Sequence, residues 1–263
     1  MNVNALRHFL LALQFFTRVP VTGRLAAWVG YSPQMLRASA AHFPGVGWIV
    51  GAVAAAVFAA ASQGLPPLAA VLLSTVATVW LTGAFHEDGL ADVVDGLGGS
   101  AQRERALEIM KDSRVGAFGA VALVLALGLK VALLAAIAAQ GVAAAVAALL
   151  AAHVLSRLAP LFLIRCLPYV GDSGASKSKP LADAIDGGAL AVGVVWSLPA
   201  AALVLLAQGA VKTAAMLLAL AAAGAWMARL FRRRLQGFTG DGLGATQQVC
   251  ELAVYGVLAW RLT

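Results

Sequence analysis

The sequence is poor in charge. Only 12% of its 263 residues are Asp, Glu, Lys or Arg, whereas 61% are hydrophobic. A soluble domain carries about a quarter charged residues, so this composition excludes an ordinary water-soluble domain. Apolar runs of about twenty residues, long enough to cross a hydrocarbon core as helix, recur from residue 41 onward. They lack the two-residue alternation of a membrane barrel. We therefore predict an all-α, polytopic membrane bundle that forms a single domain over residues 1–263.

Cysteine is also scarce, since the chain holds only Cys166 and Cys250, both in or beside apolar segments. A disulfide or a metal pair remains an alternative, but the pattern favours buried, unreactive thiols.

About seven segments are predicted to span the membrane. Residues 4–17 are apolar but short and carry Arg7, His8 and Gln14, so we expect an interfacial or re-entrant helix there, with an eighth span as the alternative. The predicted spans are 41–61, 67–85, 117–139, 142–163, 188–207, 211–230 and 243–260.

The charges divide sharply between the two sets of connecting segments. Residues 1–40, 86–116, 164–187 and 231–242, with Arg229 at the edge, hold fifteen of the nineteen basic residues and eleven of the twelve acids. The positive-inside rule places these segments and the N-terminus in the cytoplasm, and seven spans then leave the C-terminus outside. The same rule accounts for the net charge of +7, so nucleic acid is not an expected partner.

One acidic stretch, "FHEDGLADVVDGLGG" at residues 85–99, contains a third of all the acids. On a helix, Asp88, Asp92 and Asp95 share a stripe about 60° wide, where like charges repel unless a cation binds. Oxygen ligands without thiolates favour Mg²⁺ over zinc. Glu87 lies about 100° away around the helix, as a second ligand or a solvated neighbour. The simpler alternative is that these acids stabilise the first turn of a helix. A helix break at Gly89 or Gly96 would place the three aspartates on different faces.

Two further segments complement the acids. "KDSR" combines Lys111, Ser113 and Arg114 as a plausible phosphate grip, although ordinary cytoplasmic charge is the alternative. Asp241 lies among glycines just before the last span, either in a simple turn or completing a metal site. Together these features indicate phosphoryl transfer at the membrane surface. His86 is either a base or a packing residue.

These motifs resemble the cobalamin synthase family, adenosylcobinamide-GDP ribazoletransferase. The resemblance covers most of the chain and rests on "LQFFTRVPV" at 13–21, "HFPGVGWIVG" at 42–51, the acidic stretch, "RALEIMKDSRVGAFG" at 105–119, "SRLAPLFLIRCLPY" at 156–169 and "GFTGDGLGATQQVCELA" at 237–253. It implies a magnesium-dependent enzyme of the bacterial cytoplasmic (inner) membrane with a cytoplasmic active site. Its partners would be adenosylcobinamide-GDP and α-ribazole or its 5′-phosphate, and GMP would be released.

The resemblance also assigns roles to residues. It implies metal ligands at Glu87, Asp88, Asp92, Asp95 and Asp241. We expect Asp88, Asp92 and Asp95 to act in catalysis with Lys111 and Arg114, and His86, in the acidic stretch, is a further catalytic candidate. Substrate contacts would come from Arg18, Lys111, Asp112, Ser113, Arg114 and Gln247. Arg157 and Glu251 are expected to pair within the membrane, because charges there need partners. A homo-oligomer is compatible with the alanine- and glycine-rich helices.

Two rival functions remain. A CDP-alcohol phosphotransferase needs Asp-Gly-x-x-Ala-Arg, but here Asp92 stands where the alanine should be and Val93 replaces the arginine. A cation-coupled transporter would need polar groups at mid-membrane depth, and Lys130, Arg157 and Glu251 are its main support.

Overall fold

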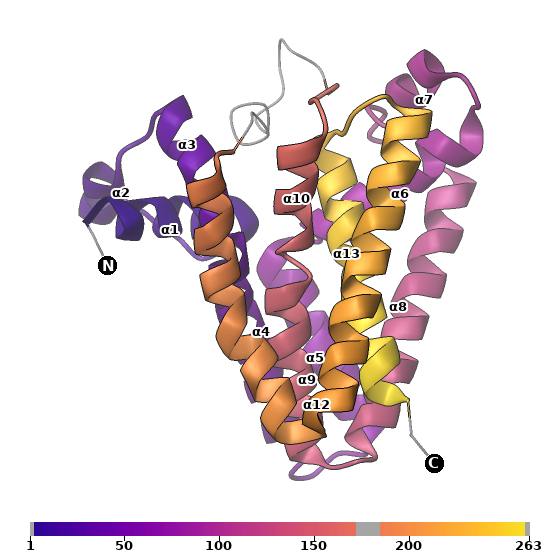
Figure 1. The fold of residues 1–263 in the computed structure, drawn as a ribbon. Helices are drawn as coiled ribbons and strands as arrows, with labels where there is room; N and C mark the ends of the chain where they lie inside the picture. Colours follow the sequence, from indigo (N-terminus) through magenta and orange to yellow (C-terminus); the bar gives the residue numbers. More distant parts are fainter. Residues whose placement is uncertain (1–2, 172–184, 261–263) are drawn as a thin grey trace.

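The computed structural model describes residues 3–171 and 185–260, and over these ranges the regular structure is helical (Figure 1). An isolated bridge between Tyr169 and Phe238 is the extended pairing recorded there. The elements are α1 (Val3–Phe16), α2 (Gly23–Val29), α3 (Pro33–Ser39), η1 (Ala40–His42), α4 (Phe43–Ala61), α5 (Pro67–Thr82), α6 (Phe85–Gly99), α7 (Arg103–Ile109), α8 (Ala117–Ala138), α9 (Val142–Leu155), α10 (Ala159–Cys166), α12 (Gly187–Arg234) and α13 (Gly240–Ala259).

Each of the seven predicted spans is helical over most of its length, which confirms an all-α membrane protein. The span predicted at 142–163 is divided between α9 and α10. The 48-residue α12 is really two legs, because Gly209 has a non-helical backbone (φ 81°) and the chain reverses direction there (Figure 1). When each continuous helical segment of the described ranges is counted once, four segments are long and apolar enough to span a membrane. The bent pair α5–α6, counted as one span, would be a fifth.

The connections gather at two ends of the bundle, as the charge pattern predicts. At one end lie α7 and the α12–α13 connection, and α1, α2 and α3 lie toward the same end on the opposite flank of the bundle (Figure 1). At the opposite end lie the α4–α5 and α8–α9 turns, the reversal within α12 and the C-terminal end of α13. The first end carries nearly all the charge, and we refer to it as the polar end. Which side of a membrane it faces stays a prediction, as does the interfacial position of α1.

The acidic segment is turned into this end by a sharp corner. Gly83 and Ala84 both have left-handed backbones (φ 66° and 59°), and α6 leaves α5 at an angle of 85°. A glycine adopts this conformation readily, whereas alanine does so at a cost. The turn ends α5 at Thr82, short of the predicted end of that span at residue 85, and brings α6 against α8 and α13.

Candidate active site

The acidic stretch forms one continuous helix, α6, so neither Gly89 nor Gly96 breaks it and the predicted stripe is preserved. Its three aspartates differ in their surroundings. Asp88 is exposed, Asp92 is half-buried and Asp95 is buried. The glycines allow neighbouring backbone to approach closely. A Cβ atom at Gly96, for example, would lie 2.8 Å from the carbonyl oxygen of Ala106 in α7.

Asp95 caps the start of α8. The backbone N–H groups of Gly116 and Gly119 donate to its two carboxylate oxygens at 2.7 and 2.8 Å. Any side chain on either glycine would collide with that carboxylate. Because these amides belong to the unsatisfied first turn of a helix, a carboxylate is well placed to accept from them. Asp95 therefore ties the acidic helix to the end of the "KDSR" segment.

Asp241 lies against the acidic helix. A Cβ atom on Gly89 would be 2.8 Å from the Asp241 carbonyl oxygen, so the backbones of α6 and α13 touch there. Partial burial, reinforced by the negative charges of Asp241, Asp88 and Asp95, raises the pKa of Asp92 to about 7. Burial likewise raises the pKa of Asp241, with Asp88 adding to the effect. These three aspartates form a cluster of mutually repelling carboxylates, which we call the acidic cluster (Asp88, Asp92 and Asp241).

The acidic cluster suits a hard divalent cation in the chemistry of its donors. Carboxylate oxygens are what Mg²⁺ prefers, and a cation would relieve the repulsion that raises the pKa of Asp92. Within residues 3–171 and 185–260, however, no three His, Cys, Asp or Glu side chains converge closely enough to hold a metal ion by themselves. Magnesium commonly completes its coordination with water and substrate phosphate, so a partial protein set is compatible with it.

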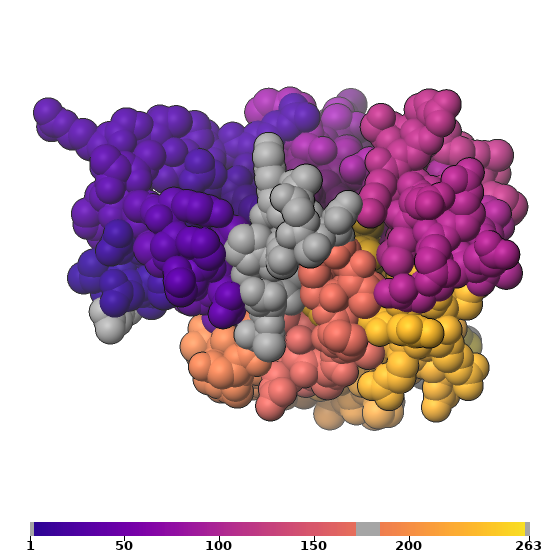
Figure 2. Space-filling view, turned by 90° about the horizontal axis from the view of Figure 1, so that it is seen from above, coloured from indigo at the N-terminus to yellow at the C-terminus, as the bar shows by residue number. Residues whose placement is uncertain are grey.

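The basic segment, residues 111–114 ("KDSR"), lies at the same end of the bundle as this cluster, and the Asp95 cap joins its C-terminal side to the acidic helix. Seen from above, the part of the chain that holds α6 and α7 adjoins the part that holds the start of α13 (Figure 2). Lys111, Ser113 and Arg114 are exposed. The Arg114 guanidinium is held by Asp112, with Nε donating to Oδ1 at 2.9 Å, and these bonds lower the pKa of Asp112 to about 2. Asp112 thus orients Arg114 and leaves part of its fork open for an anion.

Two other predicted residues lie near the α5–α6 corner. The backbone N–H of Arg18 donates to the Leu81 carbonyl oxygen at 2.7 Å, and its exposed side chain extends past Gly83. His86 is only 4% exposed and stacks on Phe16, with ring centroids 5.8 Å apart. This packing matches the structural alternative for His86. Its predicted role as a base is untested.

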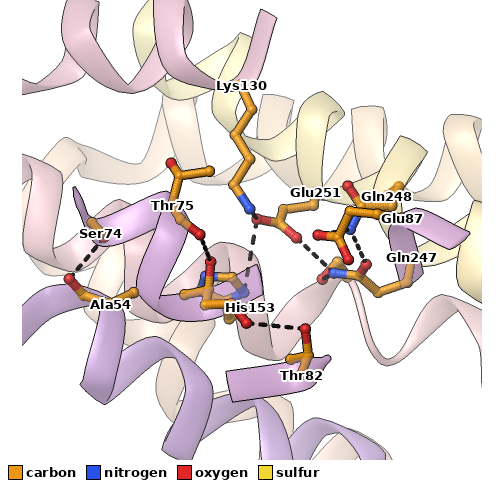
Figure 3. Close-up of polar contacts among 12 residues, drawn as sticks. Ala54, Ser74, Thr75, Thr82, Glu87, Lys130, His153, Gln247, Gln248 and Glu251 are labelled. Carbon is orange, nitrogen blue, oxygen red and sulfur yellow. Dashed lines mark hydrogen bonds and ion pairs between the residues drawn. The ribbon is translucent and has the colours of Figure 1, made fainter. Parts of the chain in front are cut away.

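Glu87 belongs to a different environment from the acidic cluster. It is 7% exposed, and Gln248 Nε2 donates to its Oε1 at 3.1 Å. Gln248 also donates to Gln247 Oε1 at 3.0 Å, and Gln247 Nε2 donates to Glu251 Oε2 at 2.7 Å. Figure 3 shows this chain of side chains from α6 across α13. Glu87 is therefore not the solvated neighbour that its spacing allowed, and its predicted role as a ligand stays untested.

The expected partner of Glu251 was wrong. Glu251 Oε1 lies 2.7 Å from Lys130 Nζ of α8, and both side chains are at most 3% exposed (Figure 3). Arg157 instead donates from Nη1 to the His153 carbonyl oxygen at 2.7 Å. We call this buried set the charge network (Glu87, Lys130, His153, Arg157, Gln247, Gln248 and Glu251). Sequence reasoning placed Gln247 at the substrate. The structure places Gln247 inside this network. The sequence reasoning gave no signal for Gln248.

Comparison with known proteins agrees with these features. The family described as Cobalamin-5-phosphate synthase matches residues 8–259. A protein of Albidiferax ferrireducens named adenosylcobinamide-GDP ribazoletransferase is 61% identical, covering 97% of this chain and 98% of the relative. Proteins with the same name from Leptothrix cholodnii and Vibrio cholerae are 51% and 43% identical, covering 98% and 95% of this chain and 96% and 92% of the relatives. No solved structure matches the chain.

Proposed function

The chain belongs to the Cobalamin-5-phosphate synthase family, and we propose that it transfers the adenosylcobinamide-phosphate group of adenosylcobinamide-GDP to α-ribazole or its 5′-phosphate. In this reaction a ribazole hydroxyl oxygen bonds to the cobinamide-side phosphorus. The bond from that phosphorus to the oxygen of GMP breaks, and GMP leaves with the electron pair. The product is adenosylcobalamin or its phosphate, so this step completes the nucleotide loop of cobalamin.

One observation carries the location of this chemistry: two contacts bring three separate segments to one place. Asp95 ties the acidic helix to the start of α8, directly after "KDSR". Gly89 brings the backbone of Asp241 against the same helix. Acids that repel one another and a segment with exposed cations thus lie at one end of the bundle, joined through α6, and this supports a site for a diphosphate bridged by a divalent cation.

We propose that Asp88, Asp92 and Asp241 hold Mg²⁺ in the loaded enzyme. When bound, Mg²⁺ would neutralise charge on the diphosphate and on the departing GMP. Lys111 and Arg114 would bind phosphate oxygens, with Asp112 orienting the Arg114 fork. A carboxylate of the acidic cluster would take the proton of the attacking hydroxyl, because His86 is buried against Phe16.

The charge partition supports a cytoplasmic position for this site in the inner membrane, since the polar end carries nearly all the basic residues. The transporter alternative is less well supported. Two of the charges that a transporter would need, Lys130 and Glu251, form a buried ion pair with each other. The cavity beside them has a volume of only about 10 Å³. A cavity of that size has room for roughly one water molecule and no more.

The test is GMP release by purified protein supplied with adenosylcobinamide-GDP and α-ribazole. We expect turnover that stops when Mg²⁺ is chelated and returns when it is added back. Asp92→Asn should lower turnover by at least about 100-fold, because a bound cation loses a charged ligand. Glu108→Gln is the matched control, since Glu108 is an exposed acid at the same end of the bundle. Normal turnover in Asp92→Asn would refute the assignment of the acidic cluster, and no GMP from the unaltered protein would refute the function.

A further inference from the structure

A groove outside the candidate active site runs along the surface of the bundle. It lies between α10 and the second leg of α12, which stand side by side in the foreground of Figure 1. Its volume is about 860 Å³, and its floor is made of small residues, including Ala221, Gly224 and Ala225. Phe162 and Cys166 form part of its opposite wall.

The groove has one apolar end and one basic end. Its lining on α12 runs from Leu217 to Arg233, sixteen residues apart in sequence. At the helical rise this is about 24 Å. Half of a bilayer, from its midplane through the headgroups, measures about 20–22 Å. The groove is therefore about one leaflet deep.

The basic end consists of Arg229, Arg232 and Arg233, all of which line the groove and are exposed. They lie at the polar end of the bundle, where lipid headgroups would be. Among the ion pairs recorded in the described ranges, no acid neutralises any of the three. Arg234, by contrast, is used structurally, since its Nη2 donates to the carbonyl oxygens of Leu97 and Ser100.

We propose that this groove binds one anionic phospholipid from the leaflet at the polar end. An acyl chain would lie against Ala221, Gly224 and Ala225, and the phosphate would lie among the three arginines. Basic clusters beside a membrane-spanning segment attract anionic headgroups, and arginine suits phosphate because it offers several donors in a fixed fork. A soluble nucleotide would leave the long apolar floor unused, and a neutral lipid would leave three cations without counter-charge.

The test uses the full-length protein in a neutral detergent, with phosphatidylglycerol and phosphatidylcholine of identical acyl chains as probes. Native mass spectrometry should show one phosphatidylglycerol retained at least about tenfold better than phosphatidylcholine. Cys166 provides a second readout, because it lines the groove and is exposed whereas Cys250 is buried. Phosphatidylglycerol should slow the reaction of Cys166 with a maleimide.

Matched variants separate a specific site from general attraction to positive charge. Replacing Arg229, Arg232 and Arg233 together by Gln should abolish the preference for phosphatidylglycerol. The control triple variant is Arg24→Gln, Arg105→Gln and Arg165→Gln, which removes the same charge from exposed positions on the polar-end segments but outside the groove, and it should keep the preference. An equal loss in both triple variants would overturn the proposal, as would equal retention of the two lipids by the unaltered protein.

A second variant tests whether an acyl chain occupies the groove, without changing its charge. It keeps the proposal testable if the arginine variant does not fold. Ala225→Phe fills the groove from an exposed position and should reduce phosphatidylglycerol retention and its protection of Cys166. Ala132→Phe on α8, also exposed but remote from the groove lining, should reduce neither. Unchanged retention in Ala225→Phe would overturn the proposal. So would Cys166–Cys166 crosslinking between two copies, since the occupant would then be a second chain.

Discussion

Asp95 offers a sharp test of how the candidate site is built. Its position in the acidic stripe predicts a metal ligand, whereas its contacts make it a cap for α8. Both of its carboxylate oxygens accept backbone N–H bonds, from Gly116 and Gly119. In Asp95→Asn, the amide NH₂ group would face one of these donors, so one bond is lost and the negative charge disappears.

The expected cost follows from these contacts. A hydrogen bond to a charged group contributes about 1.5–3 kcal/mol. A carboxylate at a helix N-terminus adds about 0.3–1 kcal/mol through the helix dipole. We therefore expect Asp95→Asn to lower the free energy of unfolding by roughly 2–4 kcal/mol. For a chain of this size, that corresponds to a fall in Tm of roughly 5–15 °C.

The assay is thermal unfolding in detergent, followed by tryptophan fluorescence, with GMP release measured on the same samples below the lowered Tm. Asp88→Asn is the matched control, because Asp88 is exposed on the same helix and should change stability by no more than about 0.5 kcal/mol. We expect Asp95→Asn to lose stability and keep most of its turnover, and Asp88→Asn to do the reverse. An unchanged Tm with turnover lost in Asp95→Asn would refute the capping role and restore Asp95 as a ligand.

Three further predictions concern the surrounding contacts. Glu251→Gln should destabilise the protein by about 3–5 kcal/mol because Lys130 is left buried and unpaired, and Lys130→Met in the same chain should restore most of the lost Tm. Gly89→Ala should lower both Tm and GMP release, since the new Cβ would lie 2.8 Å from the Asp241 carbonyl oxygen, and turnover equal to that of the unaltered protein would contradict the contact. With Mg²⁺ chelated, stability should fall as pH rises from about 4 to about 7, because the raised pKa of Asp92 favours its protonated form, and a pH titration of Tm should show a smaller fall in Asp92→Asn.

Much of this architecture could be predicted from local sequence. Apolar runs long enough to span a bilayer have few alternatives to helix, so the seven predicted spans coincide with helical segments. The unequal distribution of charge between the connections predicted which of them share an end of the bundle. The spacing of the acids also predicted a single helical stripe, and α6 is indeed unbroken.

Long-range contacts could not be predicted in the same way. Helical spacing shows which aspartates share a stripe, but it does not show which neighbouring helix each of them meets. Asp95 meets the first turn of α8, and Glu87 meets Gln248, which is 161 residues away. The choice of Lys130 over Arg157 as the partner of Glu251 likewise depends on which helices pack together. The glycines at 116 and 119 carried a usable signal, since close approach of another side chain is one reason for glycine at a helix start.

The charge network and the acidic cluster differ in what surrounds their charged groups. From this difference we infer that the network has a structural role and the cluster a catalytic one. In the charge network, Glu251 is matched by Lys130 and by Gln247 in a nearly dry interior, so its main consequence is to hold α8 and α13 together. In the acidic cluster no ion pair is recorded among the described residues, and burial together with neighbouring carboxylates raises the pKa of Asp92 and of Asp241. Repulsion of this kind costs stability, and it persists where function requires it. A ligand that brings positive charge would remove that cost, which is why we place the diphosphate and its cation at the acidic cluster rather than in the interior.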